Sequence, residues 1–264
     1  MTGPQELPST LEQGDGETAV FLLHGVGGGK TAWRDNLGAI AAAGYRAIAW
    51  DMPGYGESAT VDPYSTHALA VSLQQLIAHT GARRNVVLGH SMGGMVAQEL
   101  VALAPQTVHG LILSGTSPAF GRAEGDWQQQ FLQARFAPLD AGLSMAQLAA
   151  QLVPTMVAAD SAPDAVRAAQ AVMATVPQAS YRAALQAIVG FNRLDALTRI
   201  AVPTLCLAGE HDRNASPAVM RRMCELIAGA QYLCLPGVGH LANMEQPAAF
   251  NAAVLQFLQT HFSA

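Results

Sequence analysis

The pentapeptide GHSMG, at residues 89–93, contains a serine whose surroundings favour nucleophilic chemistry. The apolar run NVVLG leads into it, and a stretch with helical spacing follows it. A serine in a GxSxG sequence between a strand and a helix lies on a tight, strained turn, which holds its hydroxyl out above the sheet. Small residues at Gly89 and Gly93 allow the backbone to turn this sharply. This context predicts that Ser91 is a nucleophile on a nucleophile elbow.

A serine hydroxyl needs a base to remove its proton, and the base needs a third group to orient it. Candidates for both roles occur later in the chain, each directly after a predicted strand. The segment AGEHD ends at Asp212 and also contains Glu210, and the segment GVGH ends at His240. Open α/β sheets bind ligands at the carboxyl ends of their strands, so these side chains are expected near Ser91.

The segment HGVGGGKT, at residues 24–31, is a glycine-rich loop that permits two interpretations. It resembles the phosphate-binding loop of a P-loop NTPase, with Asp51 in DMPG as a possible magnesium ligand. The pattern GxxxxGK[ST] requires a glycine five residues before Gly29, however, and His24 stands there. Lys30 is the only lysine of the chain, so the NKxD motif of GTP-binding proteins is impossible. The alternative interpretation is a loop that holds an oxyanion.

Strands and helices must hold these residues in place, and the sequence predicts them from short apolar runs that alternate with segments of helical spacing. The runs lack polar alternation, which is typical of strands buried on both faces of a parallel sheet. They lie at residues 19–23, 46–50, 85–89, 109–114, 203–208 and 231–236, with one extra strand expected near residues 9–13. Helices are expected at residues 33–43, 65–79, 92–104, 216–228 and 247–261. The alternation predicts an α/β fold with a doubly wound, mostly parallel sheet.

The alternation breaks between the strand that ends near residue 114 and the one that starts near residue 203. Residues 118–199 show only helical spacing punctuated by prolines, at Pro138, Pro154, Pro163 and Pro177. We therefore expect a helical cap at residues 118–199, inserted in a core made of residues 1–117 and 200–264. The methionines of the cap, Met145, Met156 and Met173, are interpreted as core filler.

Composition excludes several classes of protein. Half of the 264 residues are hydrophobic and the net charge is −5, so a nucleic-acid partner is not expected. No apolar run approaches the ~20 residues that cross a bilayer, and the first residues lack a secretory signal, which favours a cytoplasmic location without membrane contact. The three cysteines form no CxxC pair, and the histidines lack metal-ligand spacing, so no metal site is expected.

Together these segments resemble the α/β-hydrolase fold superfamily over nearly the whole chain. The matching motifs are HGVGGG, WDMPGYGES, GHSMGG, GEHD and GVGHLANMEQP. The last part, HLANMEQPAAFNAAVLQFL, is similar to small bacterial esterases and 3-oxoadipate enol-lactonase-like proteins. The resemblance implies a serine hydrolase that cleaves a carboxylic ester or lactone of a small molecule through an acyl-enzyme, without a cofactor.

The resemblance also assigns roles to particular positions. Ser91 matches the nucleophile, His240 the general base and then acid, and Asp212 the residue that orients the imidazole, in preference to Glu210. The implied oxyanion hole consists of the backbone N–H groups of Met92 and Val26. Among the other histidines, His24 resembles the one that braces the oxyanion loop. His90 is expected to point away from the site, and His211 to lie at the surface.

Residues expected around the substrate come from the oxyanion loop, the cap and the position after the catalytic histidine: Lys30, Trp33, Trp127, Phe131, Phe136, Tyr181 and Leu241. Lys30, or Arg122, Arg135 and Arg182 in the cap, offers a charge for an acidic substrate. Neither the substrate nor the oligomeric state follows from any pattern in the sequence.

Two alternative functions stay open on the same scaffold. One is a hydrolase of carbon–carbon bonds in vinylogous diketones, several of which carry a tryptophan where this chain has Leu241. The other is a binding protein that keeps the fold without turnover.

Overall fold

A seven-stranded sheet forms the centre of the protein, in a computed structural model that describes residues 6–120 and 126–263. The strand order is β1-β3-β2-β4-β5-β6-β7, and every neighbouring pair is parallel except β1 and β3. The strands are β1 (Thr10–Gln13), β2 (Thr18–Leu23), β3 (Arg46–Trp50), β4 (Arg84–His90), β5 (Gly110–Ser114), β6 (Thr204–Gly209) and β7 (Gln231–Leu235). Each expected strand is present, including the extra one at the N-terminal edge.

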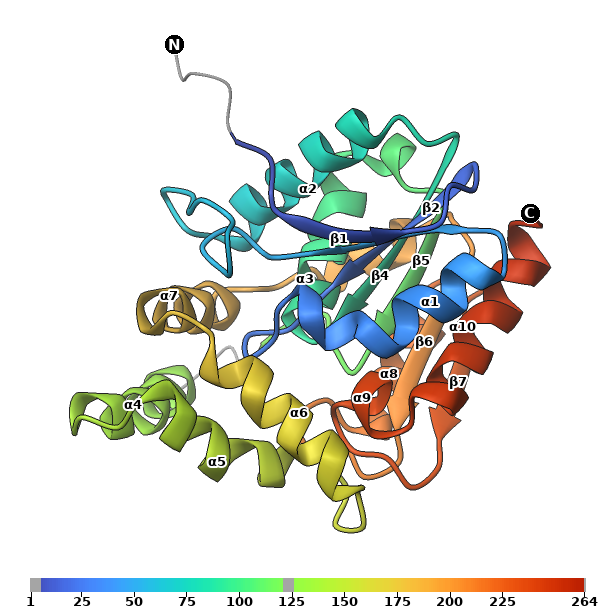
Figure 1. Cartoon of the computed structure of the whole chain (residues 1–264). Helices are drawn as coiled ribbons and strands as arrows, with labels where there is room; N and C mark the ends of the chain where they lie inside the picture. The colour runs from blue at the N-terminus through green and yellow to red at the C-terminus, as the bar shows by residue number, and fades with distance from the viewer. Residues whose placement is uncertain (1–5, 121–125, 264) are drawn as a thin grey trace.

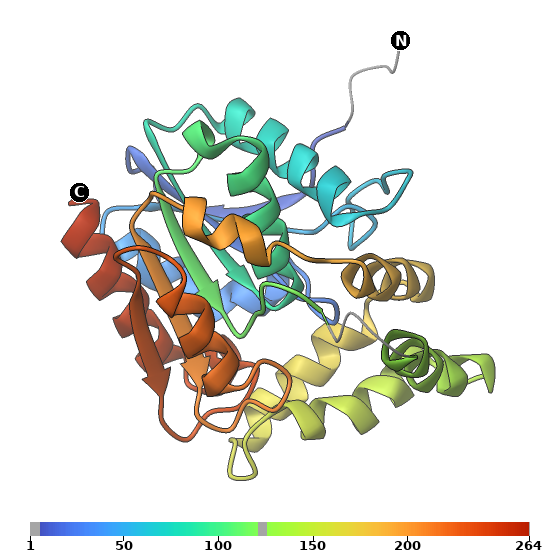
Figure 2. The same cartoon turned by 180° about the vertical axis from the view of Figure 1, so that it is seen from behind.

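Helices cover both faces of the sheet, as Figures 1 and 2 show from opposite sides. One apolar cluster packs α2 (Thr66–Thr80), α3 (Met92–Leu103) and α8 (Pro217–Glu225) against the sheet. The other cluster packs α1 (Arg34–Ala42) and α10 (Pro247–His261) on the opposite face. The prediction of a doubly wound α/β sheet is therefore confirmed. The shorter elements within the described ranges are α9 (Ala242–Glu245) and the 3-10 helices Lys30–Trp33, Pro105–Thr107 and Leu194–Arg199.

The prediction that the apolar strands are buried on both faces of the sheet is confirmed for the inner strands but is wrong for β7. All six residues of β2 are buried, whereas Gln231 and Leu233 of β7 are exposed. The difference arises because β7 is the last strand of the sheet and lies at the margin of the helical layers. An apolar run alone does not distinguish a central strand from an edge strand.

Outside residues 121–125, the helical insertion between β5 and β6 contains four α-helices. They are α4 (Trp127–Asp140), α5 (Met145–Met156), α6 (Pro163–Ala174) and α7 (Gln178–Val189). Figure 1 shows them grouped beside the sheet, at the left and lower left in that view. An isolated antiparallel bridge between Ala119 and Asn192 joins the chain where it leaves the core to the chain where it returns.

Prolines mark only some of the helix boundaries of the cap. Pro163 is the first residue of α6, and Pro177 caps the N-terminus of α7. Pro138 and Pro154 instead lie inside α4 and α5, within the last three residues of each helix. A proline near the end of a helix removes a single hydrogen bond of the last turns, so these two do not separate elements.

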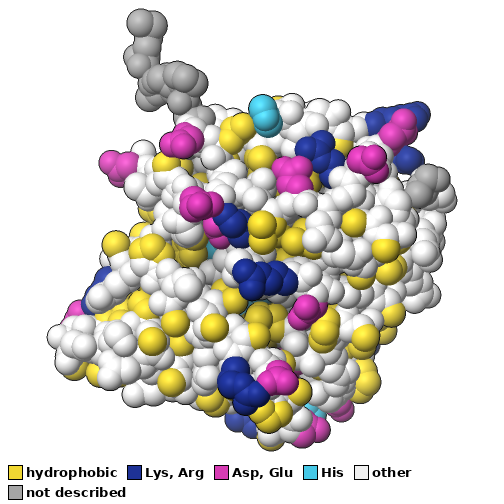
Figure 3. Space-filling model, viewed as in Figure 1, with side chains coloured by type: hydrophobic (Ala, Val, Ile, Leu, Met, Phe, Trp, Pro, Cys, Tyr) yellow, Lys and Arg dark blue, Asp and Glu magenta, His cyan; other side chains and the backbone are white. Residues whose placement is uncertain are grey.

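The described ranges contain no helix that is long and apolar enough to cross a membrane. On the face shown in Figure 3, Lys and Arg side chains lie close to Asp and Glu side chains and do not form a continuous basic surface.

Candidate active site

Ser91 lies on a strained turn between β4 and α3. Its φ of 53° and ψ of −118° make it the only non-glycine residue with positive φ among the described ranges. The Ser91 N–H donates to the Ser114 carbonyl at 2.9 Å, and the Thr116 hydroxyl donates to the Ser91 carbonyl at 2.7 Å. Such a conformation costs about 1–3 kcal/mol and persists only where neighbouring contacts hold it. Contacts from the last residue of β5 and from the loop that follows it therefore fix the serine backbone.

The two glycines of GHSMG are required by close backbone approaches. A Cβ atom on Gly89 would lie 2.4 Å from the carbonyl oxygen of Gly93. A Cβ atom on Gly93 would lie 2.2 Å from the carbonyl oxygen of Leu23 in β2. No side chain fits in either place, so the spacing GxSxG reflects the packing of the turn.

Asp212 and His240 form a buried hydrogen-bonded pair. The Nδ1 atom of His240 lies 2.8 Å from Oδ2 of Asp212, and both residues are less than 5 % exposed. The other oxygen, Oδ1, accepts hydrogen bonds from the N–H groups of Asn214 and Ala215 at 2.7 and 3.0 Å. Burial opposes ionisation, but His240 and these two N–H groups outweigh it and hold the pKa of Asp212 below its ordinary value. Asp212 is therefore an ionised carboxylate hydrogen-bonded to the imidazole of His240.

Glu210, the other carboxylate of the AGEHD segment, lies outside this arrangement. Its side chain is 53 % exposed, and it accepts a hydrogen bond from the Gly237 N–H at 2.9 Å. His211 is likewise exposed at the surface, as expected. The geometry thus brings Asp212, and not Glu210, to the imidazole of His240.

Gly115 is a residue of the site that the sequence motifs did not indicate. Its φ is +51°, and a Cβ atom there would lie 3.2 Å from Oδ2 of Asp212 and 3.3 Å from Nδ1 of His240. A side chain at this position would press on the Asp212–His240 hydrogen bond. Nothing near Gly115 in the sequence distinguishes it from the other glycines, because its neighbours come from distant loops.

His90 lies against His240 and does not point away from the site as predicted. The two ring centroids are 4.7 Å apart. His90 is buried and, like Ser91 and His240, lines a cavity between the core and the cap that is described below. Burial, followed by the neighbouring His240, lowers the pKa of His90 to about 3, so the ring is neutral at ordinary pH. His90 is the last residue of β4, and its ring lies among His240, Asp212 and the backbone of Ser114 at the end of β5.

His24 braces the glycine-rich loop after β2. The Met52 N–H donates to its Nε2 at 3.0 Å, which leaves the proton on Nδ1, and Nδ1 donates to the Gly25 carbonyl at 2.8 Å. Burial lowers the pKa of His24 to about 4, despite the opposing effects of Gly25 and Asp51. The neutral ring therefore ties this loop to the loop that follows β3.

The expected oxyanion-hole residues lie on either side of Ser91. Met92 is the first residue of α3, where the N–H group has no acceptor within the helix. Val26 lies in the loop that packs against Ser91, because a Cβ atom on Gly25 would be 2.9 Å from the Cβ of Ser91. The Tyr55 hydroxyl donates to the Val26 carbonyl at 2.9 Å and so fixes the orientation of that segment.

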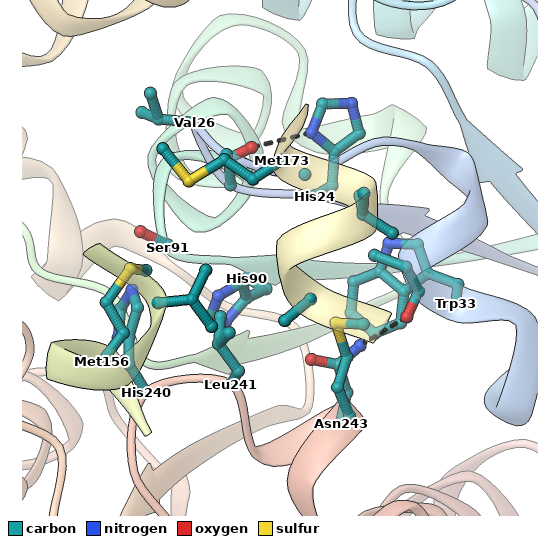
Figure 4. A pocket seen from close by; sticks show the side chains of 18 residues that line it. His24, Val26, Trp33, His90, Ser91, Met156, Met173, His240, Leu241 and Asn243 are labelled. Atoms are coloured by element: carbon teal, nitrogen blue, oxygen red, sulfur yellow. Dashed lines mark hydrogen bonds between the residues drawn. The ribbon is translucent and has the colours of Figure 1, made fainter. Parts of the chain in front are cut away.

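A cavity of about 90 Å³ extends from Ser91 and His240 between the core and the cap, as Figure 4 shows. Trp33 and Leu241, both expected there, line it. Its remaining apolar wall comes from the oxyanion loop, α5, α6 and the segment after His240, through Val26, Ala32, Val153, Met156, Ala169, Val172, Met173 and Met244. Met156 and Met173 thus line the cavity and are not only core filler, while Met145 packs against the core cluster.

Five residues expected around the substrate lie outside the lining of this cavity. Trp127 and Phe131 stack on each other, with ring centroids 5.6 Å apart. Phe136 lies beneath the guanidinium of Arg182, 4.7 Å from its ring centroid. Tyr181 is buried within the apolar cluster. Phe131, Phe136 and Tyr181 therefore belong to the apolar cluster or pack against it, and Trp127 is exposed, whereas the cap residues that line the cavity come from α5 and α6.

Lys30, the fifth of these residues, is held away from the cavity by an ion-pair cluster. Its Nζ lies 3.0 Å from Oδ2 of Asp51 and 2.9 Å from Oε2 of Glu57. Its own N–H donates to Oδ1 of Asp51 at 2.8 Å. Asp51 is therefore a buried partner of Lys30 and connects the loops after β2 and β3. Of the cap arginines, Arg135 lies over Phe131, and Arg122 falls outside the described residues.

Two buried neutral histidines predict that stability falls in mild acid. The pKa of His24 is about 4 and that of His90 about 3, whereas the unfolded value is about 6.5. As the pH drops, these two histidines therefore bind protons in the unfolded chain before they do so in the folded protein. The free energy of unfolding is thus highest above about pH 6.5 and declines below it. Each group contributes a loss of about 2 kcal/mol at pH 5, or about 4 kcal/mol together. Asp212 titrates only at lower pH and does not contribute in this window.

Urea unfolding at pH 7.5 and pH 5 measures this loss directly. The variant His90→Phe keeps a ring in place but removes one titrating group, so its loss between the two pH values is expected to be about half. A free energy of unfolding that stays constant down to pH 5 contradicts the neutral state of the two histidines.

Comparison with known proteins identifies a family and several relatives of the chain. A family model described as alpha/beta hydrolase fold matches residues 18–247. The putative carbamate hydrolase RutD of Variovorax paradoxus is 33% identical over 250 residues, which cover 92% of each chain. The 3-oxoadipate enol-lactonase 2 of Acinetobacter baylyi is 28% identical over 248 residues, with 93% of this chain and 90% of the relative covered.

Among solved structures, a thermophilic esterase from Thermogutta terrifontis superimposes with a TM-score of 0.85 at 26% identity. The match covers 96% of this chain and 93% of the esterase. Since the family model spans most of the chain, including the elbow and the segments that carry Asp212 and His240, the protein belongs to the alpha/beta hydrolase fold family.

Proposed function

We propose that this protein is a serine hydrolase that cleaves a carboxylic ester or lactone through an acyl-enzyme on Ser91. The observation that carries the proposal is the buried hydrogen bond between Asp212 and His240, since His240 lines the same cavity as Ser91. The bond places the imidazole proton on Nδ1 and leaves Nε2 free to act as a base. The esterase and enol-lactonase relatives support the same class of reaction.

In this mechanism, Nε2 of His240 takes the proton of Ser91 as Oγ attacks the carbonyl carbon of the substrate. The N–H groups of Val26 and Met92 hold the oxyanion, each contributing about 3 kcal/mol to transition-state stabilisation. His240 then returns the proton to the departing alcohol, and water repeats the cycle on the acyl-enzyme. The Ser91 hydroxyl makes no hydrogen bond to His240 among the described residues, and we expect this bond to form with substrate bound.

Hydrolysis of phenyl esters and lactones by the wild type and by Ser91→Ala tests the proposal. Turnover that depends on Ser91 is expected for the wild type, whereas a binding protein with this fold binds such compounds without turnover. A wild-type protein with no activity beyond that of Ser91→Ala contradicts the proposal.

A further inference from the structure

The cavity beside Ser91 has no charged side chain in its described lining. Its polar side-chain groups are all uncharged or imidazole: Ser91, Asn243, the indole N–H of Trp33, which has no hydrogen-bond partner among the described residues, and the rings of His24, His90 and His240. Moving a carboxylate from water into such surroundings without a partner is strongly unfavourable. The cavity therefore disfavours any ligand that places an anionic group in it.

Three cationic side chains, one on the loop after β2 and two in the cap, lie outside the lining of the cavity and are paired with carboxylates. Lys30 is paired with Asp51 and Glu57, and its side chain is only 13 % exposed. In the cap, Arg182 is paired with Asp140 and Arg167 with Asp164. Neither these cations nor Arg135, which lies over Phe131, lines the cavity, so a substrate carboxylate that entered it would meet no cationic side chain of the described lining.

From these two observations we propose that the cavity receives an uncharged acyl group and selects against acyl groups that carry a free carboxylate. The inference rests on the proposed function, and it excludes lactones and esters of dicarboxylic acids that keep one acid group free. The size of the cavity, about 90 Å³, adds that the acyl chain is short. A dry cavity of about 150 Å³ takes up a benzene ring, and this one is smaller.

A pair of esters equal in size and different in charge tests this inference. The acyl chain of phenyl 4-oxopentanoate ends in a methyl ketone. The acyl chain of phenyl hydrogen succinate has a carboxylate oxygen in place of that methyl group. With Ser91→Ala as the blank for uncatalysed hydrolysis, kcat/KM is expected to be at least about 100-fold higher for the ketone. The inference is overturned if kcat/KM is the same for the two esters. It is also overturned if neither ester is hydrolysed while phenyl butanoate is.

The variant Val172→Arg provides a matched gain of function, because Val172 lies in the cavity wall on α6 and is half-buried. A cation there is expected to raise kcat/KM for the succinate at least about tenfold relative to the ketone. Failure of this inference can be distinguished from failure of the proposed function. If the proposed function were wrong, phenyl butanoate would show no hydrolysis that depends on Ser91.

A second inference concerns Glu245, a buried carboxylate that the mechanism above does not use. Its Oε2 accepts from the Gly239 N–H at 2.9 Å and its Oε1 from the Leu241 N–H at 2.9 Å. These two residues flank His240 in the chain. The same Oε2 accepts from two residues between α5 and α6 of the cap, the Ala158 N–H at 2.8 Å and the Ser161 hydroxyl at 2.7 Å.

The backbone of His240 also contacts the cap directly. Its N–H donates to the Met156 carbonyl at 2.6 Å, and a Cβ atom on Gly239 would lie 2.6 Å from the same oxygen. From this arrangement we infer that Glu245 is a positioning residue, which fixes the backbone of His240 and joins it to the cap. The inference is independent of the substrate, because it depends only on these hydrogen bonds.

Substitution of Glu245 separates positioning from simple stabilisation. We expect Glu245→Gln to lower kcat about 10–100-fold with KM changed less than about threefold, since a displacement near 1 Å costs about 100-fold. The amide oxygen keeps some of the four hydrogen bonds, so Glu245→Ala is expected to be slower still. Rates are measured below the melting temperature of each variant, which is determined by circular dichroism.

The control is Glu210→Gln, because Glu210 also accepts a backbone hydrogen bond from this loop, at Gly237, but is exposed. Its kcat is expected to stay within about twofold of the wild type. If Glu245→Ala does not fold, Glu245→Gln and Ser161→Ala, which removes one donor from the cap, carry the test. A wild-type kcat in folded Glu245→Gln overturns the inference.

Discussion

Replacement of Ser91 by alanine is expected to lower kcat for ester hydrolysis by about four orders of magnitude or more. The variant lacks the oxygen that forms the acyl-enzyme, so His240 has no nucleophile to activate and only direct attack by water remains. Hydrolases that lose their serine keep only the residual catalysis of the oxyanion hole and of substrate binding. Steady-state kinetics with a short phenyl ester measure the loss.

Labelling with a fluorophosphonate provides an independent measurement on the same variant. One phosphonyl group is expected on the wild type, on the peptide that contains Ser91, and none on Ser91→Ala. The fold should be unaffected, because the hydrogen bond from the Ser91 N–H to the Ser114 carbonyl does not involve the side chain. A labelled Ser91→Ala variant, or one with wild-type turnover, would rule out Ser91 as the nucleophile.

The fold and the segments around Ser91, Asp212 and His240 were predictable because their signals are local. A strand buried in a parallel sheet is a short apolar run, and the chain shows one at almost every position where the structure has a strand. The turn at Ser91 is equally local, because Gly89 and Gly93 are required within two residues of the serine.

The lining of the cavity was not predictable, because it depends on how the cap helices lie relative to the core. Trp127 and Phe131 are aromatic residues of the cap, yet they stack on each other, while Met156 and Met173 on other helices face Ser91. Helical spacing identifies which residues share a face of one helix, but it does not identify what that face contacts.

Residues that support the site from a distance were missed for the same reason. The donors to Glu245 from the cap lie 87 and 84 residues away in the sequence, at Ala158 and Ser161. Gly115 contacts Asp212 and His240 from a third loop. A single sequence shows no pattern for such contacts, whereas the coordinates show them as hydrogen bonds and close approaches.

Replacement of Asp212 by asparagine is expected to lower kcat by about 10³–10⁴-fold at neutral pH, with little change in the fold. The N–H groups of Asn214 and Ala215 bind Oδ1, so they hold the amide oxygen of the new side chain in that place. The amide nitrogen then replaces Oδ2, 2.8 Å from Nδ1 of His240, and donates a hydrogen bond to it. The imidazole proton is consequently forced onto Nε2, the atom that must accept the proton of Ser91.

Glu210→Gln is the matched control for this variant, because Glu210 was the only other carboxylate proposed for the role. Its carboxylate is exposed and bound to the Gly237 N–H, so a neutral amide there should leave kcat within about twofold of the wild type. The opposite pattern, with a large loss in Glu210→Gln and a small one in Asp212→Asn, would assign the orienting role to Glu210. The Asp212→Asn variant changes the tautomer of His240 but keeps Ser91, so it should still react slowly with a fluorophosphonate. This slow labelling distinguishes it from Ser91→Ala, which has no nucleophile to label.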